Sequence, residues 1–104
     1  MPRKKETFLL VSLQEDKAKK LAQIISSGTS RKILDYLSQK QDSTESNIAK
    51  ELKLPISTVH YHLKALMKGN LVDVEEFHYS EKGKEVNHYK LANKYIIIAP
   101  KSTF

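Results

Sequence analysis

The chain has no cysteine, only three glycines among its 104 residues, and no long apolar run. Without cysteine, disulfide bonds, thiol catalysis and thiolate metal sites are excluded. Three glycines also argue against a glycine-rich nucleotide-binding loop. No apolar run approaches the roughly 18 residues that a transmembrane helix needs. The apolar run 8–11 behind the basic start is too short for a secretory signal. We therefore expect a cytoplasmic protein, without membrane contact.

The acidic side chains form no recognisable catalytic pair. The acids of 15–16 and 75–76 are neighbours in sequence, not carboxylates facing each other across a cleft. No nucleophile, base and acid share a supporting motif. We expect no enzymatic activity, no catalytic residue and no cofactor.

The four histidines do not form an obvious metal site. His60 and His62 would point about 200° apart on a helix, so they cannot bind one ion together. His78 and His88 could lie opposite each other on a hairpin, but two ligands leave a zinc site incomplete. We predict surface histidines and no metal, with a mild pH dependence of binding left open.

The charge balance points to a polyanionic partner. Lysine and arginine number 18 against 12 acids, which gives a net charge of +6. A chain of this length forms one domain, residues 1–104, with a modest core. Residues 1–6 read as a flexible basic arm.

Apolar residues recur at helical spacing in four segments, 15–27, 29–39, 44–52 and 56–68. Gly28 is predicted to end the first helix, and Thr29 or Ser30 to cap the second. Thr44 is predicted to be the N-cap of the third helix, so that residues 44–69 form a helix-turn-helix.

Three further segments have β-type composition. Residues 8–13 and 95–99 predict short terminal strands, and residues 71–92 predict a β-hairpin with a charged turn at 80–84. The order of strand, four helices, hairpin and strand indicates an α+β, mainly α, fold. This is a winged helix-turn-helix, with a helical core, a β-hairpin wing and short terminal β-strands.

The helix predicted at 56–68 has two different faces. Val59, Leu63 and Leu66 form an apolar seam, and Ser57, Tyr61, Lys64 and Lys68 gather on the opposite side. The helix would be about 20 Å long, enough to cross a major groove about 12 Å wide. No acid occurs between positions 52 and 72. A basic face of this kind suits double-stranded DNA, although an ordinary solvated face has the same pattern.

The sequence resembles the ArsR-like group of winged helix-turn-helix transcriptional regulators over roughly residues 17–93. Three segments carry the resemblance: 29–37 resembles the second helix, 47–66 the helix-turn-helix, and 69–72 the entry to the wing. The resemblance implies a dimeric repressor or activator that binds a palindromic operator. It assigns DNA recognition to Ser57, Thr58, His60, Tyr61 and Lys64, and wing contacts to Lys82 and Lys84.

Three features depart from that group. The chain lacks the cysteines of its metal-sensing members, and it ends in an apolar run, where many members have a helix. The only arginines, Arg3 and Arg31, lie off the predicted reading face. We therefore expect lysines 64, 68, 82 and 84 to contact phosphates. Base reading by Ser57, His60 and Tyr61 would be modest without arginine, which leaves more to DNA shape.

The terminal strands are too apolar to be exposed as free edges. They could pair with each other, and they could also join a partner chain. We predict that these strands and the first helix build a homodimer; the alternative is that they only complete one monomer's core. The predicted interface residues are Phe8, Leu10, Ala18, Leu21, Ile25, Ile96 and Ile98.

A second class of function remains open. Winged helices also act as protein-interaction modules in transcription and other assemblies, without reading DNA. Binding to DNA that weakens steeply with salt would favour the regulator.

Overall fold

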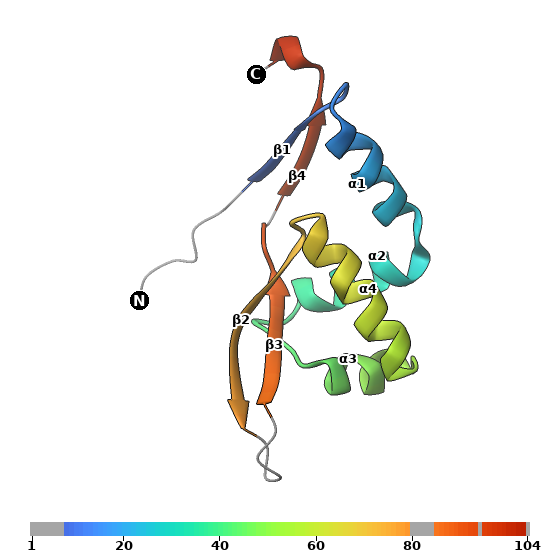
Figure 1. The fold of residues 1–104 in the computed structure, drawn as a ribbon, viewed down its shortest axis with the longest axis vertical. Coiled ribbons are helices and arrows are strands. Elements are labelled where there is room, and N and C mark those ends of the chain that lie inside the picture. The colour runs from blue at the N-terminus through green and yellow to red at the C-terminus, as the bar shows by residue number, and fades with distance from the viewer. Residues whose placement is uncertain (1–7, 80–84, 94, 104) are drawn as a thin grey trace.

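The computed structural model describes residues 8–79, 85–93 and 95–103 (Figure 1). Its elements follow in the predicted order, so the fold class is confirmed. They are β1 (Phe8–Ser12), α1 (Asp16–Ser26), α2 (Gly28–Ser38), α3 (Glu45–Leu52), α4 (Ile56–Lys68), β2 (Val72–Tyr79), β3 (Glu85–Leu91), β4 (Tyr95–Ala99) and the 3-10 turn η1 (Lys101–Thr103). The predicted basic arm, the hairpin turn, Lys82 and Lys84 lie outside the described residues.

The junction of α1 and α2 differs from the prediction. Ser27 ends α1 and also caps α2, where its side chain accepts a hydrogen bond from the Ser30 backbone N–H at 3.2 Å. Gly28 is therefore the first residue of α2 and not the stop of α1, and neither Thr29 nor Ser30 is the cap. A serine can serve both helices because its extended backbone leaves its hydroxyl facing the next turn.

Both ends of α3 are capped, and the second cap leads into the turn before α4. Thr44 is the N-cap of α3, as predicted, and accepts a hydrogen bond from the Asn47 N–H at 3.1 Å. Lys53 ends α3 in the left-handed conformation, with φ 56° and ψ 47°, and the Leu54 N–H then donates to the Ala49 carbonyl at 2.9 Å. Pro55 follows as the N-cap of α4.

The core lies between the four helices and the base of the wing. Its fully buried side chains come from α2, α3 and α4, and Leu71, Val72 and Tyr89 close it from the hairpin. Gly69 marks the close approach of α1 to the end of α4, because a Cβ there would lie 2.6 Å from Ile24 Cδ1. Asn70, with φ 61°, makes the left-handed turn that leads into β2.

The wing is an antiparallel pair of β2 and β3, with a bulge between Val74 and Phe77. The loop before α3 joins it as an isolated bridge, in which Ser43 and Tyr89 exchange backbone hydrogen bonds at 2.9 and 2.8 Å. The register of the two strands places His78 opposite Val86, so the opposition of His78 and His88 that the sequence allowed does not occur. His88 instead lies 2.7 Å from an Asp42 carboxylate oxygen.

The two terminal strands pair with each other, which is one of the two arrangements that the sequence left open. β1 and β4 form a separate parallel sheet beside α1, with Phe8 opposite Tyr95 and Leu10 opposite Ile97 (Figure 1). The Phe8 and Tyr95 rings stack with centroids 5.3 Å apart. Within the described ranges, none of the helices has the length and apolar character that a membrane crossing requires.

The left-handed Lys53 generates a stability prediction. The Cβ of Lys53 is strained in this conformation, and glycine has no Cβ. Lys53→Gly is therefore expected to raise the free energy of unfolding by about 0.5–1 kcal/mol. Urea titration would measure it. Lys53→Ala is the matched control, since it removes the same charge and keeps the Cβ. Equal effects of the two variants would contradict the backbone explanation.

Candidate nucleic-acid interface

The predicted reading face of α4 points away from the core. Val59, Leu63 and Leu66 are buried, and Ser57, His60, Tyr61, Lys64 and Lys68 are exposed. Tyr61 is the most open of the large hydrophobic side chains on this helix, at 70%. Thr58 is only half exposed, on the flank. The burial of one stripe therefore presents two lysines, two rings and a hydroxyl together.

The flank of α4 is held by its own side chains. The His62 Nδ1 lies 2.8 Å from the Thr58 carbonyl oxygen one turn earlier, so this nitrogen carries a hydrogen and donates it. The Tyr61 ring meets the His62 ring edge to face, with centroids 5.2 Å apart. This contact limits the positions that the exposed Tyr61 ring can take.

An acidic residue from α3 joins the reading face, which the sequence reading missed. The His60 Nδ1 and the Tyr89 hydroxyl both lie 2.9 Å from the same oxygen of Glu45, Oε2. Glu45 precedes His60 by 15 residues and Tyr89 by 44, so no local pattern links them. The first-turn position of Glu45 indicated only a favourable interaction with the helix dipole.

Arg31 has a structural position. Its guanidinium donates to the Ile25 carbonyl near the end of α1. The described residues therefore place no arginine on the reading face, as the sequence predicted.

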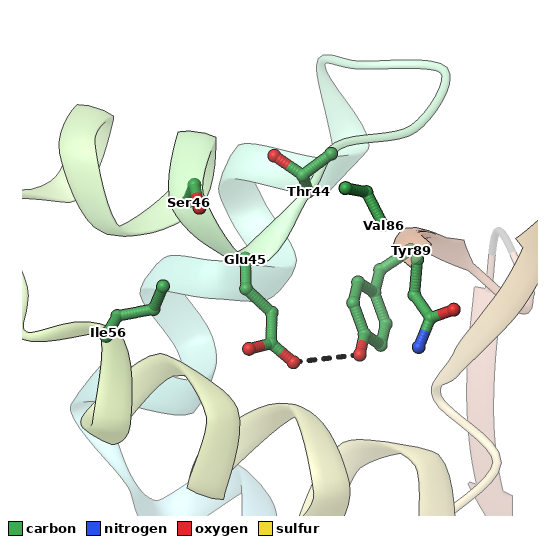
Figure 2. A pocket seen from close by; sticks show the side chains of 7 residues that line it. Thr44, Glu45, Ser46, Ile56, Val86 and Tyr89 are labelled. Atoms are coloured by element: carbon green, nitrogen blue, oxygen red, sulfur yellow. Dashed lines mark hydrogen bonds between the residues drawn. The ribbon is translucent and has the colours of Figure 1, made fainter. Parts of the chain in front are cut away.

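A pocket of about 220 Å³ lies between the starts of α3 and α4 and strand β3 (Figure 2). Figure 2 shows the Tyr89 hydroxyl donating to Glu45 across it, with Ile56 on the side of α4. Its lining residues are Thr44, Glu45, Ser46, Ile56, Val86, Asn87 and Tyr89. The pocket therefore lies where α3 and α4 meet the wing strand β3.

Burial raises the pKa of the Tyr89 hydroxyl above its ordinary value of 10.0, and the hydrogen bond to Glu45 and the charge of that carboxylate raise it further. Each of these effects disfavours the phenolate. Tyr89 therefore remains a hydrogen-bond donor to Glu45 at neutral pH.

The predicted dimer residues separate into two groups. Phe8, Leu10, Ile96 and Ile98 are exposed on the terminal sheet, with Phe8 at 53% and Leu10 at 56%. Leu21 is 3% exposed and lies in the core, so its assignment to a surface was wrong. Ala18 and Ile25 are partly buried and pack against that core. The periodicity of α1 identified an inward face but not what that face contacts.

Removal of the Tyr89 hydroxyl should destabilise the fold in a pH-dependent manner. A hydrogen bond to a charged group contributes about 1.5 kcal/mol, so Tyr89→Phe is expected to lose about that much at pH 7. Because the folded-state pKa is raised, this contribution is fully present below pH 10 and is lost as the pH rises through the folded-state value. The deficit should therefore shrink above about pH 10.

Denaturant titrations from pH 7 to 11 would measure this deficit. Tyr61→Phe is the control at pH 7, since it removes an exposed hydroxyl and should change stability by less than about 0.5 kcal/mol. A deficit for Tyr89→Phe that grows with alkaline pH would contradict the assignment.

Comparisons with known proteins give a domain match and a shared fold. The family described as "Helix-turn-helix domain" matches residues 25–75, from the last turn of α1 into β2. No curated protein sequence gives a significant match.

Several solved structures are similar to this chain. One is the homodimeric winged helix-turn-helix DNA-binding domain of Mb0332 from Mycobacterium bovis, a possible ArsR-family transcriptional regulator. It has a TM-score of 0.63 and 23% identity, over 76% of this chain and 67% of that one. Reduced HlyU from Vibrio cholerae has a TM-score of 0.60 and 22% identity, over 76% of both chains. A possible transcriptional regulator from Methanosarcina mazei has a TM-score of 0.61 and 18% identity, over 74% of this chain and 66% of that one. At these identities the likeness establishes the fold.

Proposed function

We propose that this chain, a winged helix-turn-helix protein with ArsR-like architecture, is a transcriptional regulator that binds double-stranded DNA in a sequence-dependent manner. The observation that carries the proposal is the exposed face of α4, because its apolar stripe is buried and its polar side chains project together. A helix of 13 residues presented in this way fits the major groove. This activity would place the protein in the prokaryotic cytoplasm, with the nucleoid.

The residues of the interface have different roles in this proposal. Lys64 and Lys68 contact phosphates, and the wing lysines Lys82 and Lys84 extend the phosphate contacts, which set affinity and its salt dependence. Ser57, Thr58, His60 and Tyr61 meet base edges through hydroxyl and imidazole hydrogen bonds and through ring contact with thymine methyl groups. Without arginine on α4, direct discrimination is modest and DNA shape contributes more.

The salt dependence of binding tests the proposal. Affinity for a selected duplex is expected to fall steeply as salt rises, and Lys64→Gln should reduce the slope of log K against log salt by about 1, because it removes one phosphate contact. Fluorescence anisotropy at several salt concentrations would measure the slope. Lys17→Gln on the exposed face of α1 is the control and should leave the slope unchanged. Undetectable binding to any duplex at low salt would reject DNA binding.

We further propose that the regulator is a homodimer formed through the terminal sheet. Phe8, Leu10, Ile96 and Ile98 are exposed, and β1 and β4 are strands of a two-stranded sheet. Such a sheet is marginal alone in water, and exposed apolar patches of this kind favour association. The homodimer reported for the Mycobacterium bovis domain supports a two-fold assembly. Two-fold symmetry would match an operator with half-sites about one helical turn apart.

The dimer is tested by a charge placed on the sheet. Leu10→Asp is expected to shift the protein to a monomer, because a buried unpaired carboxylate opposes association. Sedimentation velocity over a range of concentrations would measure the state. Ile56→Asp on α4, where Ile56 is similarly exposed at 52%, should remain a dimer. A wild-type chain that is monomeric at all concentrations would reject the interface.

One observation favours a second candidate function. Ile56, Tyr61 and Met67 are exposed apolar side chains on the same helix, and Glu45 lines the same pocket as Ile56. A protein partner would use such a surface without reading DNA, as in winged-helix interaction modules. The salt titration separates the two functions, since protein contacts of this kind lack the polyelectrolyte dependence on salt.

A further inference from the structure

His60 is attached to the fold by one nitrogen only. Its Nδ1 lies 2.9 Å from Glu45 Oε2, and its side chain is 51% exposed. No other hydrogen bond of this ring occurs among residues 8–79, 85–93 and 95–103. The second nitrogen, Nε2, is therefore the one that remains for a ligand on the reading face.

The carboxylate determines where the imidazole hydrogen lies. An ionised carboxylate only accepts hydrogen bonds, so the Nδ1 in contact with it must carry a hydrogen. In a neutral imidazole, Nε2 is then a bare acceptor. Tyr89 donates to the same oxygen, and Glu45 lies in the first turn of α3, where the helix dipole favours a negative charge.

Other groups near the ring do not change which imidazole nitrogen carries the hydrogen. Glu45 on α3 contacts the ring, Tyr89 on β3 donates to the same carboxylate, and Lys64 follows His60 by four residues on α4. A tyrosine hydroxyl that donates to Glu45, and an exposed lysine, leave the carboxylate as the acceptor for His60.

We infer that Glu45 is a positioning residue that sets the base preference of His60, so that Nε2 accepts a hydrogen bond from the amino group of adenine or cytosine. This rests on the proposed DNA binding. Phosphates and deoxyribose present only acceptors, and in the major groove donors occur only at adenine N6 and cytosine N4. An imidazole acceptor therefore finds no partner on the DNA backbone and becomes a base reader.

The tautomer is tested first, without DNA. Nitrogen-15 NMR of the imidazole at pH 8 is expected to show His60 with its hydrogen on Nδ1. In Glu45→Gln, the amide can donate or accept, so a fraction with the hydrogen on Nε2 should appear. Glu51→Gln, the same charge change at an exposed acid of α3, should match the wild type. A wild-type ring with its hydrogen on Nε2, alone or on both nitrogens, overturns the inference.

The base preference is tested by selection from randomised duplexes at pH 8. Comparison of wild type with His60→Ala identifies the base beneath His60. Every base pair contains one adenine or cytosine, so the preference is measured on the amino group itself. Replacing that adenine by purine, or that cytosine by 2-pyrimidinone, should weaken binding of the wild type and Glu51→Gln about fivefold, as expected for one hydrogen bond. This loss defines the preference for the amino group. Glu45→Gln should lose that preference. His60→Leu, which leaves Glu45 in place and offers neither a donor nor an acceptor, should lose it as well, so the test does not depend on the folding of one variant.

The outcomes separate the inference from the proposed function. If a site is selected but removal of the amino group leaves wild-type binding unchanged, if no base pair responds to His60→Ala, or if Glu45→Gln keeps the preference, the inference fails and DNA binding stands. If neither the wild type nor any variant enriches a sequence, the proposed function fails, and the base preference, which depends on DNA binding, fails as well.

Discussion

The burial of one stripe of α4 is the constraint on which the rest of this structure depends. Val59, Leu63 and Leu66 are almost completely removed from solvent, and their combined burial fixes the rotation of the helix about its axis. A rotation by one residue, about 100°, would bury His60 and Lys64 in one direction or Thr58 and His62 in the other, and would expose a leucine. Because that exchange is costly, the exposed face is determined by the core and not by any contact on the exposed face itself.

The wing and the reading helix form one polar unit through Tyr89. The backbone of Tyr89 pairs with Ser43 and its hydroxyl donates to Glu45, which also contacts His60. A movement of β3 against the helices would break three hydrogen bonds, so the wing is held in a definite place relative to α4. The exposed face of α4 is also less uniformly cationic than the sequence of α4 indicates, because the Glu45 carboxylate from α3 contacts His60 on that face.

The terminal sheet is built differently from the rest of the domain. β1 packs on α1 with Val11 buried, whereas most of β4 remains exposed although it consists of tyrosine, isoleucine and alanine. Backbone hydrogen bonds between β1 and β4 hold these apolar side chains in one sheet, and burial of that sheet in an assembly would then cover them. Assembly and reading would then involve separate parts of the chain, the terminal sheet and α3–α4.

The sequence alone determined the features that depend on neighbours a few residues apart. Helical periodicity and the cap at Thr44 identified four helices, β-type composition identified the hairpin and both terminal strands, and the apolar seam of α4 predicted which side chains are exposed. Tertiary structure decided what depends on distant partners. Ser27 took the cap expected at Thr29 or Ser30, the register of the hairpin set His78 opposite Val86, and Leu21 went to the core. The bond from Glu45 to His60 belongs to this second class, because a side chain acquires a partner 15 residues away only once the turn and the packed helices bring the two together.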